Sequence, residues 1–125
     1  MVDDDPSTLE LLCEVAREAG WEAYPFRRLV DVRASLNRSR PTLLILDDDL
    51  PDGRGGDLVR ELRHDERMAD TPMLVCTAAH PRRQAEIGSW APVVSKPFRL
   101  AEIDAVLDAA ARPHRRNDIP GGRAG

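Results

Sequence analysis

The chain has 125 residues, which is the size of one domain. A composition of 42% hydrophobic and 32% charged residues, with 8 Gly and 10 Pro, excludes collagen-like, coiled-coil and wholly disordered classes. No apolar run approaches the roughly 20 residues that span a bilayer, and the start MVDDDPST has neither the basic nor the apolar region of a signal peptide. We therefore expect a cytoplasmic protein without a membrane partner.

The net charge of −4 is unevenly distributed along the chain. Residues 112–125 carry four Arg against one Asp, so residues 1–111 are acidic. An acidic body repels nucleic acid phosphates, and we expect no direct nucleic acid partner. Residues 112–125 are also rich in Pro and Gly, which predicts a basic, disordered tail that follows one domain at residues 1–111.

Hydrophobic periodicity alternates between helical and strand patterns. In chain order the pattern predicts a helix at 6–19, a strand at 21–26, a helix at 29–36, a strand at 42–47, a Gly-rich loop at 49–56, a helix through Leu58, Val59 and Leu62, a strand at 73–77, a short helix near 82–88, a strand at 93–94 and a helix at 100–110. Strands that alternate with helices pair in parallel through right-handed crossovers. The sequence therefore predicts an α/β protein with an open, doubly wound parallel sheet flanked by helices.

Ligands bind to such sheets outside the carboxyl ends of the strands. Polar residues predicted at that edge are an acidic run before the first helix, Asp47, Thr77 and Lys96, which is the only lysine of the sequence. Each of them alone has an ordinary structural explanation, as a helix cap, a strand-favouring residue or a solvated cation. Together they suit the binding of a hard cation beside a phosphoryl group.

Magnesium prefers oxygen ligands and is commonly held by one or two carboxylates and a phosphate oxygen, which Asp4 and Asp47 allow here. A carboxylate can also attack phosphorus and form an acyl phosphate. Lys96 could then neutralise the transferred group, and Thr77 could donate a hydrogen bond to it. We therefore expect Mg²⁺ as the cofactor of this edge.

Four motifs carry a resemblance to a known family: Asp3-Asp4, the run LLILDDDLP at 43–51, Thr77-Ala78 and Lys96-Pro97-Phe98. In order and spacing they resemble the receiver domain of bacterial two-component response regulators. The resemblance covers residues 1–111 and implies a flavodoxin-like, five-stranded sheet of strand order 2-1-3-4-5. It also implies a signalling module that is not an enzyme and that acts by docking to a downstream protein.

The resemblance assigns a role to each motif. Asp47 would accept a phosphoryl group from a histidine kinase or a phosphotransfer protein. The magnesium ligands would be Asp3, Asp4, Asp47 and the main-chain carbonyl of Asp49. Thr77, Ala78 and Lys96 match the positions that contact the phosphoryl group, and the Lys96–Pro97 bond is expected to be cis.

Three features depart from the family pattern. Only Met1 and Val2 precede the acidic pair, so the first strand is truncated. Val93 stands where the family usually has a Tyr or Phe that reports phosphorylation, and Trp90 is out of register with that position. The interval from Thr77 to Lys96 is short and contains two prolines, which predicts a short fourth helix. Many receivers dimerise through the face that carries this helix, so a homodimer is one possible state of the protein.

Three functions remain open from the sequence. The first is a single-domain phosphoreceiver, for which we expect no further domain after the last helix. The second is a degenerate receiver that binds its partner without phosphorylation, which Val93 and the short first strand favour. The third is a phosphatase of the haloacid-dehalogenase type, because LLILDDD also reads as an apolar strand that ends in DxD.

Overall fold

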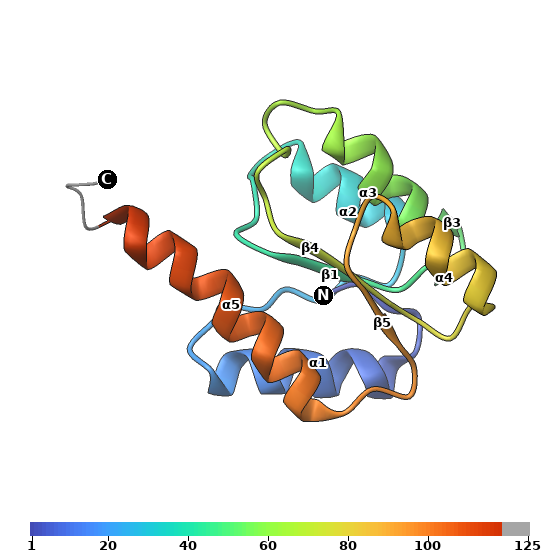
Figure 1. The fold of residues 1–125 in the computed structure, drawn as a ribbon, viewed down its shortest axis with the longest axis horizontal. Coiled ribbons are helices and arrows are strands. Elements are labelled where there is room, and N and C mark those ends of the chain that lie inside the picture. Colours follow the sequence, from blue (N-terminus) through green and yellow to red (C-terminus); the bar gives the residue numbers. More distant parts are fainter. Residues whose placement is uncertain (119–125) are drawn as a thin grey trace.

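The computed structural model describes the backbone of residues 1–118 and the side chains of residues 1–111. A parallel sheet lies between two layers of helices (Figure 1). The elements in chain order are α1 (Pro6–Glu18), α2 (Leu29–Leu36), β1 (Leu44–Leu46), β2 (Asp49–Leu50), β3 (Gly53–Arg54), α3 (Gly55–Arg63), β4 (Met73–Thr77), α4 (Pro81–Gly88), β5 (Val93–Ser95) and α5 (Leu100–Asp118).

The regular part of the sheet has the strand order β1-β4-β5, and all of its pairs are parallel. On the outer side of β1, Val2 forms parallel bridges to both Leu46 and Phe26. The full order across the sheet is therefore the segment at Phe26, the segment at Val2, β1, β4 and β5. This confirms the predicted flavodoxin-like arrangement, in which the chain segments follow the order 2-1-3-4-5.

The first two strands of that order are reduced to single bridges. The amide of Val2 donates to the carbonyl of Ile45 at 2.8 Å, and the Val2 carbonyl accepts from Asp47 at 2.9 Å. On the other side, the amide of Phe26 donates to the carbonyl of Met1 at 2.8 Å. The predicted strand at 21–26 is therefore wrong as a regular strand, because its neighbour in the sheet offers only two residues to pair with.

The loop predicted at 49–56 also differs from the expectation. It contains the antiparallel pair of β2 and β3, and α3 already begins at Gly55. At its tip, the carboxylate of Asp52 accepts hydrogen bonds from the amides of Leu29 and Val30 at 2.8 and 2.9 Å. Because helix N-termini leave backbone amides without partners, Asp52 caps α2 from a distant part of the chain.

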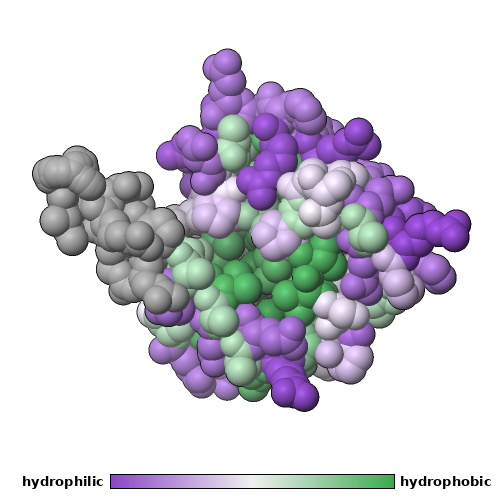
Figure 2. All heavy atoms as spheres, viewed as in Figure 1, coloured by the Kyte–Doolittle hydropathy of each residue, from purple (hydrophilic) through white to green (hydrophobic). Residues whose placement is uncertain are grey.

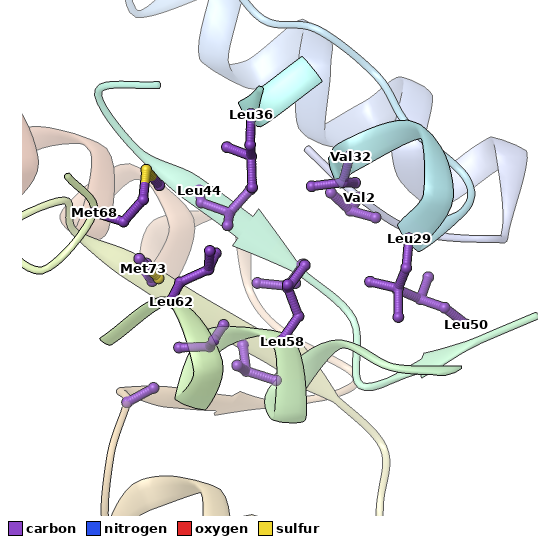
Figure 3. Close-up of a cluster of buried hydrophobic side chains, with 14 of the residues drawn as sticks. Val2, Leu29, Val32, Leu36, Leu44, Leu50, Leu58, Leu62, Met68 and Met73 are labelled. Carbon is purple, nitrogen blue, oxygen red and sulfur yellow. The ribbon is translucent and has the colours of Figure 1, made fainter. Parts of the chain in front are cut away.

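Two apolar clusters cover the two faces of the sheet. In β1, Leu44 and Leu46 point to the cluster that includes α2 and α3, whereas Ile45 points to the cluster formed with α1 and α5. Figure 3 shows the first cluster, in which Val2 and Val32 lie close together. Since both faces are covered, the strands are apolar without alternation, as the sequence indicated.

A cavity of about 600 Å³ lies at the opposite edge of the sheet from the polar strand ends. Its walls include Met1, Trp21, Leu44 and Leu107. Figure 2 shows apolar atoms gathered in a hollow between the α2/α3 layer and the α1/α5 layer. The cavity therefore has an apolar lining that residues of both helical layers supply.

The C-terminal boundary of the domain stays a prediction. The backbone of α5 continues to Asp118, through the first part of the segment 112–125 that the sequence assigned to a tail. The side chains from 112 onward and all of residues 119–125 lie outside the described residues. Among the described helices, none has the length and apolarity that crossing a bilayer requires.

We predict that Val2→Ala destabilises the domain by about 2 kcal/mol, because it removes buried methyl groups from a residue that bridges to both neighbouring segments. Urea unfolding at neutral pH measures the change. Val30→Ala is the matched control, because Val30 is 56% exposed on α2, and its effect should stay within about 0.5 kcal/mol. Equal effects of the two substitutions would contradict the role given to Val2.

Candidate functional site

Three carboxylates meet at the carboxyl edge of the sheet. Asp3, Asp4 and Asp47 each place an oxygen within 4.8 Å of the others. Asp3 and Asp47 are buried, whereas Asp4 is exposed. The ammonium of Lys96 lies 2.6 Å from Asp3 Oδ2 and 3.2 Å from Asp47 Oδ2. The structure therefore brings together four side chains that the sequence predicted at one edge.

The sheet accounts for this convergence. Asp3 follows the Val2 bridge, Asp47 follows β1 and Lys96 follows β5. Parallel strands end at the same edge, so residues far apart in the chain become neighbours there. The amide of Lys96 also donates to the carbonyl of Thr77 at 2.9 Å, which holds the end of β5 against the end of β4.

Burial and charge set the protonation of the pair at the centre. Burial raises the pKa of Asp47 above its ordinary value, although the nearby ammonium of Lys96 and the amide of Asp49 oppose this shift. Burial alone would lower the pKa of Lys96, but its hydrogen bond to Asp3 and the charge of Asp47 raise it overall. Lys96 therefore stays charged, and its ammonium compensates for the two buried carboxylates.

The other predicted residues lie around this centre. Thr77 is fully buried, and its hydroxyl accepts a hydrogen bond from the amide of Ala79 at 3.1 Å. Ala78 is exposed next to it. The amide of Asp49 donates to Asp47 Oδ1 at 3.3 Å, and the Lys96–Pro97 peptide bond is cis.

Val93, the atypical switch position, is half-buried in β5 and packs against the cluster on the α2/α3 face together with Trp90. The indole of Trp90 donates to the carbonyl of Gly56 at 2.8 Å, and the guanidinium groups of Arg60 and Arg83 lie over its ring at 5.0 and 5.9 Å from the ring centroid. The aromatic side chain of this region is therefore held in place by three contacts.

The acidic cluster fits a divalent cation of the hard class. Its three carboxylates offer oxygen ligands only, which is the donor set that Mg²⁺ prefers. Asp4 is the exposed member, so it is accessible to an ion that retains part of its water shell. Asp3 and Asp47 would exchange part of their contact with Lys96 for contact with the ion.

Two glycines allow α3 to approach this edge closely. A Cβ on Gly55 would lie 1.9 Å from the carbonyl oxygen of Asp47, and one on Gly56 would lie 2.9 Å from Asp48 Oδ1. In return, the amide of Gly55 donates to the Asp48 carbonyl at 2.9 Å, and the amide of Gly56 donates to Asp48 Oδ1 at 3.0 Å. The glycines therefore fix the backbone that follows Asp47.

The sequence analysis missed a second ion pair beside the acidic cluster. Asp48 is 1% exposed, and its two oxygens accept from Nε and Nη2 of Arg83 on α4 at 3.0 and 2.9 Å. Burial alone would raise the pKa of Asp48, but the hydrogen bonds from Arg83 and Gly56 lower it overall. The run of three aspartates marked Asp48 as polar at a strand end, but nothing in the sequence singled out Arg83 among 17 arginines.

Comparisons with known proteins agree with this geometry. The family model of the response regulator receiver domain matches residues 1–108. The transcriptional regulatory protein GltR of Pseudomonas aeruginosa is 32% identical over 125 residues, covering 98% of this chain and 52% of that protein. The phosphate regulon transcriptional regulatory protein PhoB of the same organism is 29% identical, covering 90% of this chain and 50% of that protein. The chain thus spans about half the length of these curated relatives.

Solved structures show the same fold. The signal receiver domain of a signal transduction histidine kinase from Syntrophus aciditrophicus superposes with a TM-score of 0.83 at 22% identity, covering 92% of this chain and 89% of that one. The chemotaxis response regulator CheY4 of Vibrio cholerae gives a TM-score of 0.74 at 22% identity, covering 87% and 93%.

The chain belongs to the receiver domain family of two-component response regulators. Members of this family are signalling modules, and the fold, the polar strand ends and the family match agree with that class. The haloacid-dehalogenase interpretation of the DxD run has no support from the family match.

We predict that Gly55→Ala lowers the stability of the domain by about 1–3 kcal/mol, because the new methyl group would collide with the backbone of Asp47. Gly88→Ala is the matched control, because a Cβ there meets nothing within 4 Å and alanine favours the helix. Thermal unfolding of both variants measures the effect. A Gly55→Ala protein as stable as the Gly88→Ala protein would contradict the close approach of α3.

Proposed function

We propose that this receiver accepts a phosphoryl group on Asp47 from a histidine kinase or a phosphotransfer protein, and that it signals by docking to a protein target. The observation that carries the proposal is the contact of Lys96 Nζ with Asp47 Oδ2 at 3.2 Å inside the acidic cluster. A carboxylate nucleophile and a fixed ammonium at the same edge are the groups that acyl phosphate formation needs.

The transfer would proceed by direct attack. An oxygen of Asp47 forms a bond to phosphorus while the bond from phosphorus to the nitrogen or oxygen of the donor breaks, and the electron pair leaves with the donor. Lys96 would then contact the transferred oxygens, where its positive charge offsets the charge that phosphorylation adds. The hydroxyl of Thr77, which accepts a hydrogen bond from the amide of Ala79, would donate a hydrogen bond to the same group, and Ala78, which is exposed, would contact it.

Magnesium would be held by Asp3, Asp4 and Asp47, with the main-chain carbonyl of Asp49 as a further ligand. When bound, such an ion supplies positive charge to the oxygens of a phosphoryl group. The fit rests on the three oxygens within 4.8 Å of one another. Asp3 would keep part of its contact with Lys96, so Asp4 would contact the ion more directly.

A receiver that binds its partner without phosphorylation is the second candidate. Val93 in place of an aromatic residue favours it, because a valine has no ring that can turn inward to report the new group. The intact set of Asp47, Thr77 and Lys96 favours phosphoryl acceptance. Phosphorylation by acetyl phosphate, read as intact-protein mass, separates the two candidate functions.

We predict that incubation with acetyl phosphate and Mg²⁺ adds one phosphoryl group, read as intact-protein mass, and that Asp47→Asn abolishes the adduct without unfolding the domain. The amide lacks the nucleophilic oxygen but keeps the shape of the side chain. Asp104→Asn on α5 is the control, because Asp104 is exposed on a helix outside the cluster, and it should keep the adduct. A full adduct on Asp47→Asn would overturn the assignment, and a folded wild type without an adduct would favour the second candidate.

We predict that Asp4→Ala weakens Mg²⁺ binding by about tenfold or more, because it removes the exposed member of the cluster. Calorimetric titration with MgCl₂ measures the affinity. Asp104→Ala should leave the titration unchanged. An unchanged affinity of the Asp4→Ala protein would remove Asp4 from the metal site.

A further inference from the structure

The helix α4 has a weak apolar attachment to the rest of the domain. Ile87 is its only buried apolar side chain among the described residues, whereas α1 contributes four and α3 contributes three, namely Leu58, Val59 and Leu62. Elements with few buried apolar side chains open at low free-energy cost. The polar contacts of α4 therefore have a large share in fixing its position.

Arg83 makes the most extensive of these contacts. Its guanidinium binds carboxylates from three places: Asp48 after β1, Asp57 on α3 at 2.9 Å, and Glu86 on its own helix. The side chain of Arg83 is 12% exposed and that of Asp48 is 1% exposed. These bonds raise the pKa of Arg83 well above its usual value, so the group is always charged.

Gln84, the next residue, contacts the other side of the candidate site. Its amide nitrogen donates to the carbonyl of Ala79 at 2.8 Å and to Ser95 Oγ at 3.3 Å. Ala79 belongs to the loop that follows Thr77, and Ser95 directly precedes Lys96. Two consecutive residues of α4 therefore contact the segments that carry Asp47, Thr77 and Lys96.

We propose that Arg83 is a positioning residue, which acts through Asp48 and couples the position of α4 to the charge at Asp47. Asp47 and Asp48 are consecutive in the chain, and the Asp48 carboxylate is held by Arg83 and by the amide of Gly56. A change of charge at Asp47 acts electrostatically on the neighbouring carboxylate of Asp48. It thereby alters how the guanidinium of Arg83 is shared among Asp48, Asp57 and Glu86. The inference deepens the proposed function by naming a route from the site to α4, and only its phosphorylation arm rests on that function.

This route does not need an aromatic side chain at position 93. Val93 packs against the apolar cluster, and the ring of Trp90 contacts the guanidinium groups of Arg60 and Arg83. Arg83 instead contacts the residue next to the phosphoacceptor directly. The ion pair would therefore transmit the state of the site through charge and hydrogen bonds rather than through a ring rotation.

Amide hydrogen exchange of residues 81–88 tests the coupling. Asp47→Asn removes a charge without any phosphorylation, and we expect it to change the exchange rates of α4 by about fivefold or more in the otherwise unchanged protein. In the Arg83→Gln background the same substitution should change them by less than about twofold. Arg82→Gln is the matched control, because Arg82 is an exposed neighbour on the same helix, and its background should keep the full response.

A second variant guards against misfolding. The pair Asp48→Asn and Arg83→Gln replaces the buried charges by amides that can still form hydrogen bonds, and it should also abolish the response. Two results would overturn the proposal. One is that Asp47→Asn still changes the exchange of α4 in the background of the double variant. The other is that Asp47→Asn has no effect on α4 when it is the only substitution. Phosphorylation with acetyl phosphate should change the amide exchange of α4 in the wild-type protein and not in the double variant. If α4 responds to Asp47→Asn but no adduct forms, the coupling stands and the proposed function fails.

Discussion

The contact of Lys96 with Asp3 and Asp47 is the interaction on which the site depends. Two buried carboxylates at one edge would repel each other, and burial raises the pKa of Asp47. The ammonium, at 2.6 and 3.2 Å from them, offsets that cost and links the first segment of the sheet, β1 and β5. Because these residues are 93 and 49 positions apart from Lys96, the contact requires the complete parallel order of the sheet.

The first segment shows how little of a strand this order needs. Val2 alone bridges to Leu46 and Phe26, yet Asp3 still reaches the edge because its position follows from that one residue. At the other end of the sheet, a cavity of about 600 Å³ is lined by apolar side chains that include Trp21, Leu44 and Leu107. Figure 2 shows the apolar hollow between the two helical layers.

Periodicity predicted the layers and the strand β4 from Met73 to Thr77, because continuous apolar runs are typical of strands covered on both faces. It failed at 21–26, where aromatic residues favour a strand but the neighbouring segment is too short to pair with them. It also failed at 49–56, since two-residue strands carry no periodicity. The motifs predicted Asp3, Asp4, Asp47 and Lys96, whereas Arg83 is specified only by tertiary contact and has no local signal.

Three consecutive aspartates differ in their roles: Asp47 is the proposed phosphoryl acceptor, Asp48 is the partner of Arg83, and the backbone amide of Asp49 donates a hydrogen bond to Asp47. The most direct test is to phosphorylate the protein with acetyl phosphate, reduce the acyl phosphate with borohydride, and locate the resulting homoserine by peptide sequencing in a mass spectrometer. The account predicts homoserine at position 47 alone. Homoserine at position 48 or 49, or its absence from a folded and phosphodonor-treated protein, would contradict it.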